Sequence, residues 1–97
     1  MKIYISGRIS GLPFDDVKKK FDAAQMRLEE QGYEVINPLN NGLTEKHSWA
    51  EHMKADIKML MDCDEIYMLK GYTESKGAMI EYNLAQDLGY DITIQIK

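Results

Sequence analysis

Near its start the chain carries Lys2-Ile3-Tyr4-Ile5-Ser6, followed at once by Gly7-Arg8-Ile9-Ser10-Gly11. The first segment is rich in β-branched and aromatic side chains, which is typical of a buried strand, and the two glycines of the second indicate a loop. Beyond this loop, apolar residues recur at helical spacing. We therefore expect a strand, a loop and then a first helix that has Asp15 as its N-cap and ends at Gly32.

The same alternation of strand and helix continues along the rest of the sequence. One further helix is expected after the capping-box pair Ser48 and Glu51, and another over residues 77–88. Their predicted inward faces carry Trp49, Met53, Ile57, Leu60 and Met61 in the first, and Ile80, Leu84, Ala85 and Leu88 in the second. Further strands are predicted at residues 33–37, 64–69 and 92–96. The order βαβαβαβ predicts an α/β fold in a single domain over residues 1–97, with a parallel four-stranded sheet flanked by three helices.

Composition limits the classes of function. Twelve Lys and Arg against sixteen Asp and Glu give a formal net charge of −4, which disfavours duplex nucleic acid as a partner. Cys63 is the only cysteine, and His47 and His52 have no metal-ligand spacing, so we expect no disulfide, metal or other cofactor. No apolar run is long enough to cross a membrane, and the first residues do not look like a signal peptide, so we expect a cytoplasmic protein. A core this small also favours a homodimer or a higher homo-oligomer.

Candidate ligand-binding residues lie in the loops that follow the predicted strands, because ligands of open parallel sheets bind beyond the carboxyl ends of the strands. The first loop offers an anion free backbone amides, hydroxyl groups and a guanidinium group, from Ser6, Gly7, Arg8, Ser10 and Gly11. An ordinary strand-to-helix turn is the alternative interpretation. A later loop leads through Ser75 and Gly77 into the last helix, where free amides and the Ser75 hydroxyl can hold a phosphate or hydroxyl group. Alternatively, Ser75 is a plain N-cap.

Two carboxylates are distinctive because helical periodicity turns them toward the sheet. Glu81 lies inside the apolar stripe of the last helix, and Asp56 flanks the stripe of the helix before it. Retaining glycosyl transfer requires such a pair, with an ionised carboxylate to attack the anomeric carbon and a second group to protonate the leaving group. The alternatives are an edge position that reaches solvent or pairs with a lysine for Glu81, and a salt bridge or an interface contact for Asp56.

Taken together, these segments resemble the nucleoside 2-deoxyribosyltransferase family, and within it a small bacterial and phage-borne branch. The resemblance is carried by Tyr4-Ile5-Ser6-Gly7, Ser10-Gly11, Asp56-Ile57, Asp64-Glu65-Ile66-Tyr67 and Ser75-Lys76-Gly77-Ala78-Met79-Ile80-Glu81. It implies a flavodoxin- or Rossmann-like domain that acts on the N-glycosidic bond of nucleosides or nucleotides. It also implies that neighbouring subunits complete the pocket.

Matched position by position, the resemblance implies a role for each candidate residue. Glu81 would be the nucleophile, Tyr4 would hydrogen-bond and orient it, and Asp56 would help to protonate the departing base. Ser75 with Gly77, and the loop after Ser6, would bind the sugar hydroxyl or its 5′-phosphate. Many relatives have proline at the position of Arg8, and an arginine there would favour a phosphorylated ligand.

The expected function is cleavage of the N-glycosidic bond, or transfer of the deoxyribosyl group between bases, on a nucleoside or nucleoside 5′-monophosphate. Two other functions stay open at this point. One is a non-catalytic protein that senses or sequesters a nucleotide derivative, and the other is a structural oligomer. The sequence does not distinguish transfer to a base from transfer to water, because the two reactions share their first half.

Overall fold

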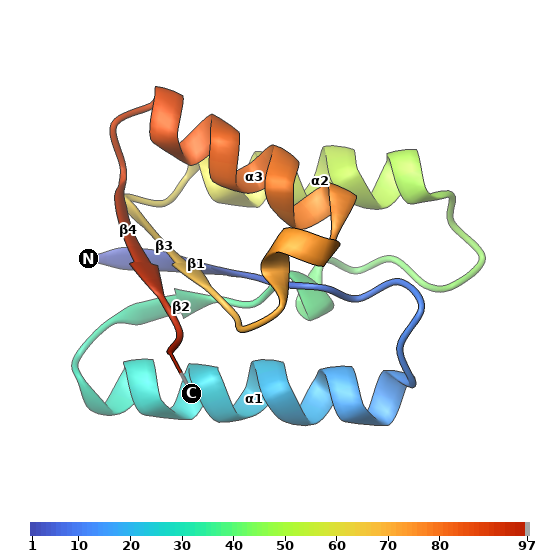
Figure 1. Cartoon of the computed structure of the whole chain (residues 1–97), viewed down its shortest axis with the longest axis horizontal. Helices are drawn as coiled ribbons and strands as arrows, with labels where there is room; N and C mark the ends of the chain where they lie inside the picture. Colours follow the sequence, from blue (N-terminus) through green and yellow to red (C-terminus); the bar gives the residue numbers. More distant parts are fainter. Residues whose placement is uncertain (97) are drawn as a thin grey trace.

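The computed structural model describes residues 1–96. Its elements are β1 (Lys2–Ser6), α1 (Phe14–Glu30), β2 (Glu34–Ile36), a 3₁₀ turn η1 (Pro38–Asn40), α2 (Trp49–Met61), β3 (Glu65–Met68), a 3₁₀ turn η2 (Tyr72–Glu74), α3 (Lys76–Asp87) and β4 (Asp91–Ile94). All four strands run parallel in the order β2-β1-β3-β4. Helix α1 covers one face of the sheet, whereas α2 and α3 cover the other (Figure 1). This confirms the predicted parallel four-stranded sheet and its βαβαβαβ order.

The alternation of side chains along β1 divides the core into two halves. Ile3 and Ile5 are buried against α1. Tyr4 belongs to the other half, which lies under α2 and α3, and Ser6 points the same way because side chains of a strand alternate between its faces. The central strand therefore presents two polar side chains to the helix that carries Glu81.

The predicted N-caps of the helices are correct for α2 and wrong for α1. The capping box of Ser48 and Glu51 is confirmed, with both of its hydrogen bonds present. The prediction of Asp15 as an N-cap is wrong, because α1 begins at Phe14 and Pro13 occupies the cap position without a side-chain hydrogen bond. The Pro13 carbonyl accepts from the amides of the first turn, which leaves Asp15 inside that turn, where its charge favours the helix N-terminus.

The predicted inward faces of α2 and α3 are correct only in part. Ile80 of α3 and Leu88, which caps its C-terminus, are 37% and 42% exposed, and the buried residues of this helix are Ala78, Glu81 and Ala85. The small alanines let α3 approach the sheet closely, so the larger side chains lie at its flanks. Trp49 and Met61 at the two ends of α2 are exposed as well. No helix within residues 1–96 is both long and apolar enough to cross a membrane.

Candidate active site

Glu81 is the centre of the site. It projects from α3 toward β1 and is only 4% exposed. The Tyr4 hydroxyl donates a hydrogen bond to its Oε2 at 2.8 Å, and the Ser6 hydroxyl donates one to its Oε1 at 2.6 Å. Glu81 forms no ion pair with a lysine of the described residues, and it does not reach out to solvent as an edge residue would. The carboxylate is therefore buried and held by neutral hydroxyl groups.

This environment changes the protonation of Glu81 and Tyr4. Burial raises the pKa of Glu81 to about 7, against the hydrogen bonds from Ser6 and Tyr4, which lower it. The charge of Asp56 raises this pKa further. Burial, followed by the charge of Glu81, raises the pKa of Tyr4 well above its usual value of 10.0, so its hydroxyl stays a hydrogen-bond donor near neutral pH. Glu81 therefore exchanges its proton in the physiological range.

Asp56 is the second buried carboxylate, 6% exposed on α2. The amide Nδ2 of Asn41 donates a hydrogen bond to Asp56 Oδ1 at 2.8 Å. Burial raises the pKa of Asp56, whereas the Asn41 hydrogen bond and the nearby His52 lower it. The sequence analysis missed Asn41 altogether. Its only signal was its place in the loop after the second strand, at the edge of the sheet where ligands bind.

A cavity of about 780 Å³ opens beside both carboxylates. Seven of the predicted site residues line it, namely Tyr4, Gly7, Ser10, Asp56, Ser75, Gly77 and Glu81. Much of its remaining lining is apolar, from Ile9, Phe14, Leu39, Leu43, Trp49 and Met53. A cavity of this size and composition is typical of small-molecule sites. Among residues 1–96, no Lys or Arg side chain lines it.

The start of α3 forms one wall of the cavity. The Ser75 hydroxyl accepts a hydrogen bond from the amide of Ala78 at 3.1 Å, so Ser75 caps the helix and still has a hydroxyl proton to donate. A side chain at Gly77 would place its Cβ 3.0 Å from the sulfur of Met53. The lack of a side chain at Gly77 therefore leaves room for Met53 of α2 beside the first turn of α3. Beside them, the Lys76 ammonium lies 5.1 Å from the centre of the Trp49 ring.

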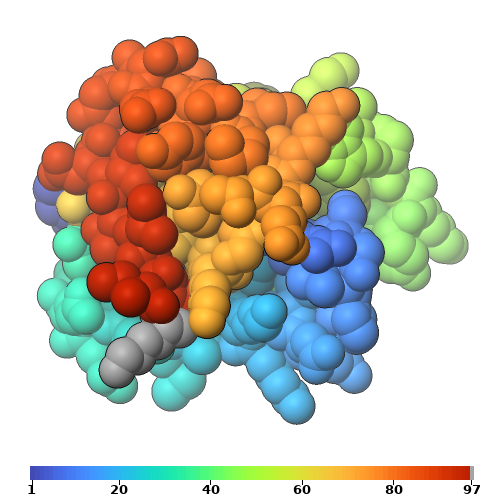
Figure 2. Space-filling model, viewed as in Figure 1, coloured from blue at the N-terminus to red at the C-terminus, as the bar shows by residue number. Residues whose placement is uncertain are grey.

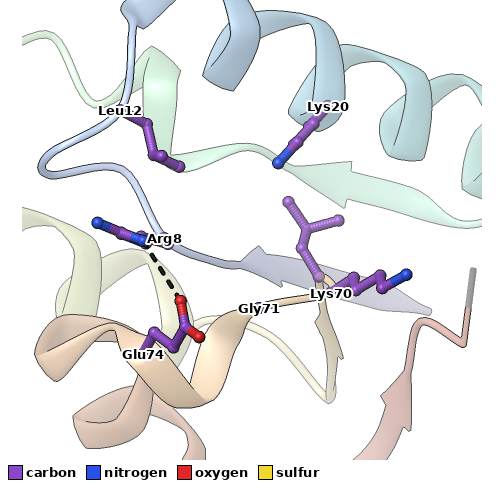
Figure 3. A pocket seen from close by; sticks show the side chains of 7 residues that line it. Arg8, Leu12, Lys20, Lys70, Gly71 and Glu74 are labelled. Carbon is purple, nitrogen blue, oxygen red and sulfur yellow. Dashed lines mark hydrogen bonds and ion pairs between the residues drawn. The ribbon is translucent and has the colours of Figure 1, made fainter.

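Three predicted ligand-binding residues lie outside the cavity lining. The hydroxyl of Ser6 contacts Glu81, as described above. Gly11 has a left-handed backbone with φ of +82°, so it serves the turn into α1. Arg8 lines a separate hollow of about 120 Å³, where its guanidinium lies 3.4 Å from a carboxylate oxygen of Glu74 (Figure 3). In the space-filling view the loop after β1 and the segment of η2 are side by side (Figure 2).

Comparison with known proteins places the chain in a family. A domain of unknown function, DUF4406, matches residues 1–94. The chain therefore belongs to the DUF4406 family. No curated protein matches it in sequence.

Among the described residues, no group of three His, Cys, Asp or Glu side chains is arranged to hold a metal ion.

The fold of this DUF4406 domain is similar to that of a solved enzyme. A 2-deoxyribosyltransferase from the psychrotolerant bacterium Bacillus psychrosaccharolyticus superposes with a TM-score of 0.75. The match covers 97% of this chain and 71% of that enzyme, at 21% sequence identity. That enzyme is described as a biocatalyst for the industrial synthesis of antiviral and antitumoral nucleosides. At this identity the match shows a shared fold, in agreement with the predicted resemblance.

Proposed function

We propose that this DUF4406 domain cleaves the N-glycosidic bond of a nucleoside or nucleoside 5′-monophosphate through a covalent glycosyl-enzyme intermediate on Glu81. The observation that carries the proposal is the Glu81 carboxylate, which is buried, oriented by Tyr4 and Ser6, and positioned at a cavity that it shares with Asp56. The similarity of the fold to a 2-deoxyribosyltransferase supports the choice of substrate class.

In the first half-reaction, a carboxylate oxygen of Glu81 attacks C1′ of the sugar. The C1′–N bond breaks, its electron pair leaves with the base, and Asp56 gives the base a proton. In the second half, water or a second base attacks C1′ and the bond from C1′ to Glu81 breaks. Asp56 takes up the proton that the attacking group releases, so the site returns to its starting state.

The proton equilibrium of Glu81 sets the pH dependence of this reaction. Attack requires the ionised carboxylate, and the pKa of Glu81 lies at about 7. Ionisation of Glu81 is therefore expected to raise the rate of base release as the pH increases through 7, and loss of the proton from Asp56 is expected to lower it at higher pH. The hydrogen bonds from Tyr4 and Ser6 fix the direction in which the carboxylate points, which holds it ready for one approach to C1′.

The test measures free base released from a panel of nucleosides and 5′-monophosphates. Wild-type protein is expected to release base from at least one of them, and Glu81→Ala to lose at least about a thousandfold in rate, the order of loss on removing a nucleophile. Glu30→Ala is the matched control, since Glu30 is exposed at the far end of α1 and does not line the cavity. Equal rates for Glu81→Ala and Glu30→Ala would show that Glu81 is not the nucleophile.

A second candidate is a protein that binds a nucleoside derivative without cleaving it. Both oxygens of Glu81 already accept hydrogen bonds, and these reduce the electron density available for attack. Binding without cleavage would raise the melting temperature while no base is released, in the wild type as in Glu81→Ala. If no nucleoside or nucleotide shifts the melting temperature, both proposals are wrong, and the structural role named at the outset is what remains.

A further inference from the structure

We propose that Asn41 is a positioning residue that holds Asp56 in place, and that neutral His52 in turn holds Asn41. Asn41 lies in the loop between η1 and α2. Its side chain makes three contacts, which use both amide protons and the oxygen. Nδ2 donates to Asp56 Oδ1 at 2.8 Å and lies 3.1 Å from His52 Nδ1, while Oδ1 accepts from the Leu43 amide at 2.9 Å.

These partners determine which way the Asn41 amide points. A backbone N–H can only donate, so the atom that faces Leu43 is the oxygen. Asp56 Oδ1 accepts both when the carboxyl group is ionised and when it carries its proton on Oδ2, so the atom that faces it is the NH₂ group. If the amide were turned over, it would place its oxygen against the carboxylate and lose the bond to Leu43. The contacts therefore allow one orientation.

The same reasoning sets the tautomer of His52. Its Nε2 lies 2.8 Å from the carbonyl oxygen of Thr44, which can only accept, so Nε2 carries a proton. Its Nδ1 faces the NH₂ group of Asn41, which can only donate, so Nδ1 carries none. The ring in this network is neutral. A second proton on Nδ1 would set two donors against each other and break the contact that holds Asn41.

Charged groups close to His52 come from α2 and from the loop before it. On α2 they are Asp56, one turn further along, and Glu51, whose pKa is lowered chiefly by its hydrogen bonds with Ser48. In the loop, the His47 ring centre lies 6.2 Å from that of His52.

The consequence for Asp56 is a fixed carboxylate with one oxygen available. Oδ1 is occupied by Asn41, and Oδ2 accepts no hydrogen bond from residues 1–96. Under the proposed function, on which this role rests, Asn41 leaves Oδ2 to deliver the proton to the base. Because it donates to the charged form, Asn41 also keeps the pKa of Asp56 below the value that burial alone would set.

The experiment follows the carboxyl carbon of Asp56 by ¹³C NMR through a pH titration of the whole chain. In Asn41→Ala the pKa of Asp56 is expected to rise by about 0.5–1 unit, the size of one lost hydrogen bond. Asn40→Ala is the matched control, because Asn40 is exposed and its side chain makes no hydrogen bond within the described residues. An unchanged titration in Asn41→Ala would overturn the proposal.

Variants of His52 test the second link and do not depend on Asn41→Ala folding. His52→Ala removes the acceptor and is expected to raise the pKa of Asp56, whereas His52→Asn offers an oxygen near the place of Nδ1 and is expected to restore it. Nitrogen NMR of the wild type at pH 8 is expected to show the proton on Nε2. A proton on Nδ1, or equal titrations of Asp56 in His52→Ala and the wild type, would show that His52 does not hold Asn41.

Base release separates this inference from the function on which it rests. If the enzyme is active, Asn41→Ala is expected to lower kcat about tenfold or more with little change in KM, because the Asp56 carboxyl group, although its pKa is higher, is no longer held in position to deliver its proton. A shifted titration of Asp56 without base release in the wild type would support the positioning role and refute the proposed catalysis. A rise in KM with kcat unchanged would assign Asn41 to ligand binding and overturn the positioning role.

Discussion

The two hollows at the carboxyl edge of the sheet differ in how they hold charge. The large cavity contains the buried carboxylates of Glu81 and Asp56, each of which accepts hydrogen bonds from neutral donors only. The small hollow is lined by the cationic side chains of Arg8, Lys20 and Lys70, which are solvated, and Lys70 points away from the ion pair of Arg8 and Glu74 (Figure 3). Burial therefore shifts proton equilibria in the first region, whereas solvent screens charge in the second.

The largest expected effect is on the pH dependence of stability, through Glu81. Its pKa is 4.5 in an ordinary setting and about 7 in the folded chain, so between these values the folded state binds the proton that the unfolded state has lost. The free energy of unfolding therefore falls as the pH rises from about 4.5 to 7, by about 3 kcal/mol. Below pH 4.5 the full stabilisation from the proton on Glu81 is present, and above pH 7 it is lost.

Denaturant titrations at pH 5 and pH 8 measure this effect in the wild type and in Glu81→Gln. The glutamine has the same shape and cannot ionise, so the fall in unfolding free energy from pH 5 to pH 8 is expected to be smaller by about 2.5 kcal/mol in the variant. Equal drops in the two proteins would mean that Glu81 titrates normally in the folded chain, which would remove the contrast between the two hollows.

Periodicity was sufficient for the sheet and for the side of α3 on which Glu81 lies, because both depend on regular repeats. Periodicity was not sufficient to predict which side chains form hydrogen bonds with Glu81. Strand alternation places Ser6 and Tyr4 on one face, but the sequence analysis assigned Ser6 to a ligand, since nothing local shows that its hydroxyl reaches a residue 75 positions away. Asn41 and Arg8 lie in loops, whose paths follow no repeat. Residue type alone suggested a phosphate ligand for Arg8, whose side chain lines the small hollow instead of the cavity.

The next effect concerns the wall between the two regions, where Gly7 meets Leu69. A side chain at Gly7 would place its Cβ 2.9 Å from the Leu69 Cβ, closer than packed carbon atoms approach. Gly7→Ala is therefore expected to lower the free energy of unfolding by about 1–3 kcal/mol, as overpacked cores do. Thermal melting followed by circular dichroism measures it.

Gly42→Ala supplies the matched control. Gly42 has φ of +83° and nothing within 4 Å of an added Cβ, so alanine there meets backbone strain alone, about 1 kcal/mol. If Gly7→Ala costs no more than Gly42→Ala, then Leu69 yields easily and the wall does not rigidly separate the cavity from the hollow.

The smallest effect is expected at Arg8. Its ion pair joins a half-exposed Arg8 to an exposed Glu74, so Arg8→Ala is expected to change the free energy of unfolding by less than about 1 kcal/mol. Since Arg8 lies outside the cavity, calorimetry is expected to show the same change, within about twofold, in the affinities for a nucleoside and for its 5′-monophosphate.

Lys70→Ala controls for the loss of one positive charge in the same hollow. A loss of tenfold or more that is confined to the monophosphate and to Arg8→Ala would place the phosphate at the small hollow, as the type of this residue first suggested. The bound sugar would then have to extend over Gly7, and the two regions would form one site. Equal affinity changes for both ligands would favour an unphosphorylated nucleoside. A phosphate dianion in the cavity would meet Glu81 and Asp56 without an opposing Lys or Arg in the part of the chain described here.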